Sequence, residues 1–105
     1  MKKAKIAELS VYLPERVVGN LEIEERVNAQ RQLLPPGGLQ RLFGIEERRY
    51  AAKGQQVSDL AAAAARPTVE KIGASNIEFL IFAAACADLI EPATCNIVQH
   101  KLGLR

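Results

Sequence analysis

The sequence predicts an α/β fold in which a helical excursion follows the first strand. Segments with β-strand patterning alternate with helical segments, and this alternation is typical of layered α/β proteins. The run Phe79–Cys86 is apolar at every position, as expected of a strand that is covered on both faces. A sheet of only two parallel strands has marginal stability by itself. We therefore expect the sequence to form the first part of a larger domain.

The composition is that of an ordinary globular protein. Of the 105 residues, 49% are hydrophobic and 25% are charged, which argues against disorder of the whole chain. The net charge of +2 gives no reason to expect binding to nucleic acid or to a membrane surface. No segment approaches the roughly 20 apolar residues of a membrane helix or resembles a signal peptide. Cys86 and Cys95 are not spaced as CxxC, and we expect reduced thiols in a cytoplasmic protein.

The first strand is predicted over residues 4–12, where apolar and polar side chains alternate. Pro14 ends it, because proline cannot donate a hydrogen bond to a strand ladder. Val17-Val18 is expected to add a short extended piece before Gly19.

The excursion is predicted to be mainly helical. Asn20 is a suitable N-cap for a helix over Leu21–Gln32, whose first turns are acidic. The run Pro35-Pro36-Gly37-Gly38 predicts a loop, either a plain connector or a mobile lid. Leu39–Phe43 is long enough for one or two helical turns, with Gly44 at the C′ position.

A charged strand and an alanine-rich helix are expected next. Ile45–Ala51 predicts a strand or hairpin arm, whose two glutamates and two arginines suit an exposed edge. A turn at 53–56 leads to Ser58, which is predicted to cap the following helix. Pro67 interrupts that helix, so it either kinks or divides in two; we favour one kinked helix that ends at Gly73.

The last third is predicted to contain a turn at 74–76, the strand Phe79–Cys86, a loop and a helix. The loop Asp88–Glu91 follows the carboxyl end of the strand, the usual place for ligand contacts in parallel sheets. The helix is expected to start at Pro92 or Thr94 and to close at Gly103.

No catalytic or metal site can be assembled from these residue types. His100 lies near the end of the last predicted helix, where we expect a surface residue. Cys86 is expected to be a buried small hydrophobe. Cys95 lies in a first helical turn and is the better thiolate candidate, although we favour a packing role. One histidine and two distant cysteines do not make a metal site. A basic cluster suits either phosphate binding or pairing with its own acidic neighbours, and it comprises Arg41, Arg48, Arg49 and Lys53.

Several short motifs occur in an order that resembles a known family. Tyr12-Leu13-Pro14-Glu15-Arg16-Val17 is followed by Asn20 and by Gly44-Ile45-Glu46-Glu47-Arg48. The similarity continues through Val57–Ala62, Phe79–Ala85 and Pro92–Gly103, and so covers essentially the whole chain. Together these segments resemble the opening of β-ketoacyl-acyl-carrier-protein synthase III. The related 3-hydroxy-3-methylglutaryl-CoA synthases remain an alternative.

The resemblance implies an incomplete thiolase-like fold over residues 1–105, the first part of an N-terminal α/β half with an excursion at about 17–56. It implies a homo-oligomeric acyltransferase of fatty acid biosynthesis, with acyl-CoA and acyl carrier protein as partners and no cofactor besides the thioester substrate. The family transfers an acyl group to a cysteine and then performs a decarboxylative Claisen condensation with a malonyl thioester. None of its catalytic Cys, His and Asn residues maps onto this chain, and Cys95 does not match the nucleophile.

The resemblance also indicates one substrate-binding residue. The family has a tryptophan and an arginine shortly before the Gly44-Ile45 segment, but this chain has no tryptophan, and Leu42 occupies the place of that arginine. Arg41, one position away, is therefore the candidate for contact with CoA or carrier phosphate.

By itself the 105-residue chain is expected to be inactive. An alternative is a non-catalytic binding or assembly module that completes the fold with a partner chain.

Overall fold

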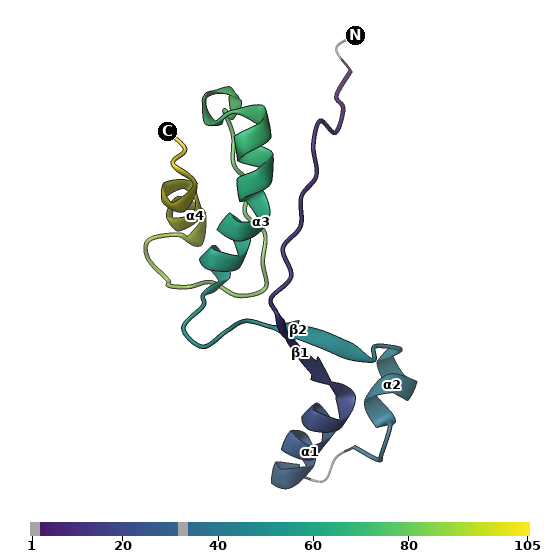
Figure 1. The fold of residues 1–105 in the computed structure, drawn as a ribbon. Helices are drawn as coiled ribbons and strands as arrows, with labels where there is room; N and C mark the ends of the chain where they lie inside the picture. The colour runs from purple at the N-terminus through teal and green to yellow at the C-terminus, as the bar shows by residue number, and fades with distance from the viewer. Residues whose placement is uncertain (1–2, 32–33) are drawn as a thin grey trace. The chain divides into compact units, whose positions relative to one another are not determined.

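The computed structural model describes residues 3–31 and 34–105. Its elements are β1 (Arg16–Gly19), α1 (Asn20–Arg31), α2 (Gly38–Phe43), β2 (Glu47–Tyr50), α3 (Val57–Ile72), the 3-10 turn η1 (Ala74–Asn76) and α4 (Thr94–Leu102) (Figure 1). They form two compact units. The larger unit contains the chain up to Leu13 and residues Lys53–Arg105, and the smaller unit contains Pro14–Ala52. The assignment of one domain with an excursion at about 17–56 stays a prediction.

The smaller unit is built on a pair of short strands that α1 and α2 separate along the chain. β1 and β2 are antiparallel, with Val18 opposite Arg48 and Gly19 opposite Glu47. Val18 is fully buried, whereas most of the remaining side chains of the two strands are exposed. The short extended piece at Val17-Val18 and the charged arm within Ile45–Ala51 are thus confirmed.

α1 follows β1 directly, and the predicted cap at Asn20 is wrong. Asn20 is the first helical residue, and its side-chain amide donates to the Ile45 carbonyl oxygen at 2.6 Å. The Arg48 guanidinium donates to its amide oxygen at 2.7 Å. The contacts with Ile45 and with Arg48 of β2 thus occupy both polar atoms of the side chain that was expected to cap the helix. Gln32, the predicted last helical residue, lies outside the described residues.

α2 ends where a glycine permits the left-handed backbone conformation. Gly44 has φ 66° and ψ 11°, and its N–H donates to the Gln40 carbonyl oxygen at 2.8 Å. A residue with a Cβ is strained at this φ, so glycine is the suitable C-cap here. The predicted short helix and its C-terminal glycine are confirmed.

α3 is the longest helix of the described residues, and it continues through Pro67. One helix ending at Gly73 is therefore confirmed, but the predicted cap at Ser58 is wrong. The helix begins one residue earlier, at Val57, with Gln56 and Asp59 forming a reciprocal capping box. Ser58 lies within the first turn and is fully buried.

α3 packs against α4 around a small apolar core. Ala62, Val98 and Leu102 are its buried members, with exposed fractions of 8% or less. α4 starts at Thr94 and closes at Gly103, as predicted, and η1 occupies the predicted turn. Ala62 is small enough to let the two helices approach closely, while Leu102 fills the space beside it. None of the helices in the described ranges is long and apolar enough to span a membrane.

The two predicted core strands are absent from the described residues. Segments 4–12 and 79–86 run beside α3 without forming a ladder (Figure 1), and the single described sheet contains only β1 and β2. A strand is assigned by its hydrogen bonds to a neighbour, so apolar patterning alone does not make one.

The prediction that Cys86 is buried is also wrong, because Cys86 is exposed. In segment 79–86 only Leu80 and Phe82 pack against the core, while Ile81 between them is 80% exposed. Contact with the helices therefore ends at Phe82, and residues 83–87, with Cys86 among them, are exposed.

We predict that Leu102→Ala lowers the free energy of unfolding by about 2–4 kcal/mol, because it leaves a cavity between α3 and α4. Urea unfolding followed by circular dichroism at 222 nm measures the change. The matched control is Leu89→Ala, in the same unit, whose side chain is 52% exposed. An equal loss of stability in both variants would contradict the assigned core.

Candidate functional site

The loop after segment 79–86 is attached to the start of α3. The Asp88 carboxylate accepts the Ser58 N–H through both oxygens, at 3.1 and 3.3 Å. The Asp88 N–H in turn donates to Thr94 Oγ1 at 3.1 Å, and Thr94 is buried. This loop is the one predicted to make ligand contacts, and these bonds fix it to α3 and α4.

Lys101 connects the end of α4 to the same helical turn. Its ammonium donates to Ser58 Oγ and to Asp59 Oδ1, both at 2.6 Å. Asp59 also accepts the Gln56 N–H at 2.9 Å. The two carboxylates and one ammonium thus converge on the first turn of α3, where the helix dipole favours negative charge.

The hydrogen bonds of this cluster lower the pKa values of its two carboxyl groups. The Ser58 hydroxyl, followed by the backbone N–H groups of Ser58 and Val57, holds the pKa of Asp88 below its ordinary value of 3.8, although burial opposes this. Its hydrogen bond with Lys101, helped by the Gln56 N–H, lowers the pKa of Asp59 in the same direction. Both groups are therefore carboxylates at neutral pH.

The Ser58–Lys101 pair is not arranged for nucleophilic catalysis. A serine nucleophile requires an unprotonated base and access to substrate. Here the lysine forms an ion pair with Asp59, and Ser58 is fully buried, so substrate has no access to its hydroxyl. The cluster therefore positions the loop and does not supply a reacting group.

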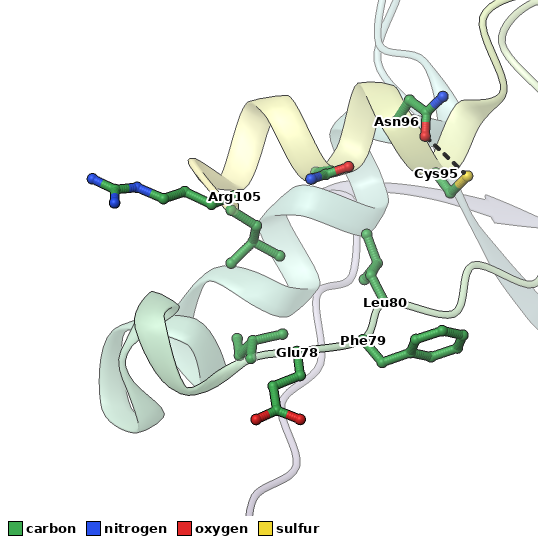
Figure 2. Close-up of a pocket in the computed structure, with 9 residues that line it drawn as sticks. Glu78, Phe79, Leu80, Cys95, Asn96 and Arg105 are labelled. Carbon is green, nitrogen blue, oxygen red and sulfur yellow. Dashed lines mark hydrogen bonds between the residues drawn. The ribbon is translucent and has the colours of Figure 1, made fainter.

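The cysteines and the histidine do not assemble into a catalytic pair. Cys95 is half-buried, and its thiol donates to the Asn96 side-chain oxygen at 3.6 Å (Figure 2). His100 is exposed, as predicted. Within residues 3–31 and 34–105 no group of three His, Cys, Asp or Glu side chains is placed to hold a metal ion.

Two of the open cavities in the described part of the chain border residues 77–90. A cavity of about 210 Å³ lies between Ile77–Leu80 and α4 and is lined in part by Gln99 and Arg105 (Figure 2). Another, of about 560 Å³, is bordered by Phe82–Ala87 and by both cysteines. Neither cavity brings together the acid, base and nucleophile that acyl transfer requires.

In the smaller unit a buried carboxylate joins α1 to the loop before α2. The two oxygens of Glu24 accept the N–H groups of Leu39, at 2.9 Å, and Gly37, at 3.0 Å. Glu24 is only 4% exposed, although it lies on a short surface helix. The bonds to Leu39 and then Gly37 hold the pKa of Glu24 below its ordinary value of 4.5, and the charge of Arg41 acts in the same sense. Glu24 thus ties the loop before α2 to α1.

Arg41, the predicted substrate-binding residue, lies on the exposed face of α2. Its guanidinium donates to the Pro36 carbonyl oxygen at 3.1 Å. This bond engages one nitrogen of a group with five N–H donors. The structure thus places Arg41 beside the Pro-Gly loop, while its role in binding stays a prediction.

Glu24 and Lys101 were missed as positioning residues. Nothing in the sequence marks Glu24 apart from Glu22 and Glu25, which share its turn of the helix. The partners of Lys101 lie more than 40 residues earlier in the chain. No local spacing rule connects positions that far apart, so these contacts depend on the tertiary fold.

Comparison with known proteins relates nearly the whole chain to one enzyme type. No protein-family model matches it. A β-ketoacyl-[acyl-carrier-protein] synthase III of Laribacter hongkongensis is 39% identical over 106 residues, which cover 99% of this chain and 32% of the relative. A synthase III of Koribacter versatilis is 36% identical, with coverage of 99% and 30%. The chain thus spans about 30% of the length of the curated relatives that it matches.

Solved structures agree with this relation. A β-ketoacyl-[acyl-carrier-protein] synthase III of Thermus thermophilus matches 96% of this chain with a TM-score of 0.76 and 31% identity. A variant of Xanthomonas campestris OleA matches 95% with a TM-score of 0.80 and 30% identity. The chain covers 30% and 31% of these two structures, so the shared part is a partial thiolase-like fold.

We predict that Glu24→Gln removes an acid-sensitive part of the stability of the smaller unit. The folded-state pKa of Glu24 lies below its ordinary value, so its contribution is present above pH 4.5 and is lost as the pH falls through the folded-state pKa. Urea unfolding at a series of pH values should show a steeper acid loss in the wild type than in the variant. Glu25→Gln, at an exposed position of the same helix, is the control. If the free energy of unfolding had the same pH dependence in the wild type and in Glu24→Gln, the stabilising role assigned to the Glu24 carboxylate would be contradicted.

Proposed function

We propose that this chain, which is homologous to the N-terminal 30% or so of β-ketoacyl-acyl-carrier-protein synthase III, is the N-terminal segment of a condensing enzyme of that type. The full reaction would transfer an acyl group to a cysteine and then condense it with a malonyl thioester by decarboxylation. The 105 residues would supply the excursion and the first helices, and no catalytic residue.

One observation carries the proposal: the similarity is continuous from end to end of this chain. It covers 97–100% of the chain in relatives of 34–39% identity. An isolated shared motif would cover only a short segment. The motifs on which the resemblance depends also fall at element boundaries in the structure. Gly44 ends α2, and Gly103 ends α4.

The chemistry of the chain's own residues is consistent with a supporting role. Asp88 and Lys101 hold the loop after segment 79–86, and Glu24 holds the loop before α2. Such loops can bind a thioester without supplying the nucleophile. We propose acyl-CoA and acyl carrier protein as partners, a homo-oligomer, and a cytoplasmic location with reduced thiols.

A second candidate is a non-catalytic assembly module that completes its fold with a partner chain. The specific observation that favours it is the exposure of large apolar side chains along both extended segments, such as Leu9 at 85% and Phe79 at 82%. A 3-hydroxy-3-methylglutaryl-CoA synthase-like enzyme would share the same condensing chemistry.

We predict that the protein purified from its source has a mass well above 11.5 kDa and forms a 3-oxoacyl thioester from acyl-CoA and a malonyl thioester. Intact-mass spectrometry and a product assay measure the two properties separately. The 105-residue chain by itself should give no product. A source protein of 11.5 kDa would contradict the enzyme proposal and favour the assembly module. A larger protein that lacks condensing activity would contradict the proposed reaction alone.

We predict that Arg41→Ala weakens binding of CoA by about two- to fivefold, the effect expected for one exposed charge pair. Isothermal titration with CoA in low salt measures the dissociation constant, and added salt should weaken wild-type binding. Arg31→Ala, which removes another exposed arginine of the smaller unit, is the control. Equal affinities for the wild type and Arg41→Ala would exclude Arg41 as a phosphate contact.

A further inference from the structure

The two cysteines of the larger unit border the same cavity. Cys86 is exposed, Cys95 is half-buried, and both are free thiols. The cavity has a volume of about 560 Å³ and opens to solvent. Most of the other side chains that line it are alanines, namely Ala83, Ala84, Ala85, Ala87 and Ala93. Side chains this short do not screen one thiol from the other.

A hydrogen bond closes the loop that separates the two cysteines. The Asp88 N–H donates to Thr94 Oγ1 at 3.1 Å, so the two ends of this loop are held together. The Asp88 carboxylate accepts the Ser58 N–H, which fixes the same end of the loop to α3. Cys86 lies two residues before this contact, and Cys95 lies one residue after it. Because consecutive Cα atoms are only about 3.8 Å apart, both cysteines stay near the closed end of the loop.

The stretch of chain that carries Cys86 can move toward Cys95. Residues 83–87 are exposed, and in the part of the chain that the structure describes no backbone hydrogen bond joins them to another segment. A disulfide requires the two Cα atoms to approach to about 4.4–6.8 Å. The Cys95 thiol donates to Asn96 Oδ1 at 3.6 Å (Figure 2), so closure also requires this side chain to rotate away from a weak contact.

We propose that Cys86 and Cys95 form a reversible disulfide, with a small-molecule disulfide such as glutathione disulfide as the oxidant. The thiolate of the exposed Cys86 attacks one sulfur of the oxidant, breaks its S–S bond and releases one glutathione thiolate. The Cys95 thiolate then attacks the Cys86 sulfur of this mixed disulfide and releases the second glutathione. The two protein thiols lose two protons and two electrons, which the two glutathione products take up.

The disulfide changes both the loop and the cavity. It restrains residues 87–94 by closing a short ring, and it takes up part of the space between the two thiols. In a reducing compartment the thiols stay free, so the pair responds to a rise in the concentration of small-molecule disulfides. The inference does not rest on the proposed acyl transfer, because neither cysteine matches the nucleophile of the related enzymes.

Incubation of the purified chain with glutathione disulfide tests the proposal. The chain has no other cysteine, so we expect both free thiols to disappear with no glutathione bound. A peptide map without reductant should join the peptides of Cys86 and Cys95, and dithiothreitol should restore both thiols. Cys86→Ser and Cys95→Ser should each retain one glutathione, because the thiol that would expel it is absent.

Thr94→Val tests whether the loop contact brings the thiols together. It removes the hydroxyl that accepts the Asp88 N–H, so the ratio of internal to mixed disulfide at fixed glutathione concentrations should fall about two- to tenfold. The matched control is Thr68→Val, whose lost hydroxyl contacts Ser10 Oγ at 2.5 Å and lies outside the loop. This control should leave the ratio unchanged.

Three outcomes would overturn the proposal. A wild-type chain that keeps glutathione on either cysteine, without an internal bond, would show that the two thiols do not meet. Disulfides that join two chains would show that each thiol reaches a neighbouring molecule and not its own partner. An equal ratio in the wild type and in Thr94→Val would contradict the role given to the Asp88–Thr94 hydrogen bond. None of these results bears on the acyl-transfer proposal, which is tested by product formation.

Discussion

The hydrogen bonds around the buried hydroxyl of Ser58 hold the larger unit together. Only three apolar side chains of that unit, Ala62, Val98 and Leu102, are buried in the described residues. A core of this size contributes little hydrophobic free energy by itself. Lys101 at one end of α4 and Asp88 near its other end both bond to Ser58, so the polar cluster fixes how the two helices pack. Since every partner is hydrogen-bonded, burial of these groups is tolerated.

Each unit uses a carboxylate that is distant in sequence to satisfy backbone N–H groups near the start of a helix. Asp88 serves α3 in the larger unit, and Glu24 serves α2 in the smaller unit. The free N–H groups at a helix start attract negative charge, so both acids are stabilised as carboxylates. The structural consequence is similar in the two units. In each unit a loop that precedes or follows these elements is held in one conformation by hydrogen bonds.

The relation to β-ketoacyl-acyl-carrier-protein synthase III gives these positioned loops a context. The chain has about 30% of the length of those relatives, and its extended segments leave their outer faces uncovered. Faces that expose several large apolar side chains are usually covered by another layer of structure. A covering layer from more of the same fold, from a second copy or from another protein would satisfy the same physical need. The uncovered faces thus connect the enzyme and assembly-module proposals.

Local sequence signals determined much of the secondary structure. Gly44, Gly73 and Gly103 end helices because each has a positive φ that other residues adopt only with strain. The start of α4 was also predicted from residues close in sequence, and so was the favoured alternative of one helix past Pro67. The same order of motifs, taken together, indicated the related enzyme family and the thiolase-like fold. A resemblance of this kind needs only the sequence, because it compares residue order and not contacts.

The tertiary structure decided the parts that depend on distant partners. Segments 4–12 and 79–86 have strand patterning, but a strand requires a hydrogen-bonded neighbour, and the described residues supply none. For the same reason Cys86 is exposed, and Asn20 bonds to the β2 arm instead of capping its own helix. The roles of Glu24, Asp88 and Lys101 arise from contacts between positions 6 to 43 residues apart. Sequence spacing specifies which residues share a helix face, whereas only the packed chain specifies which of them meet.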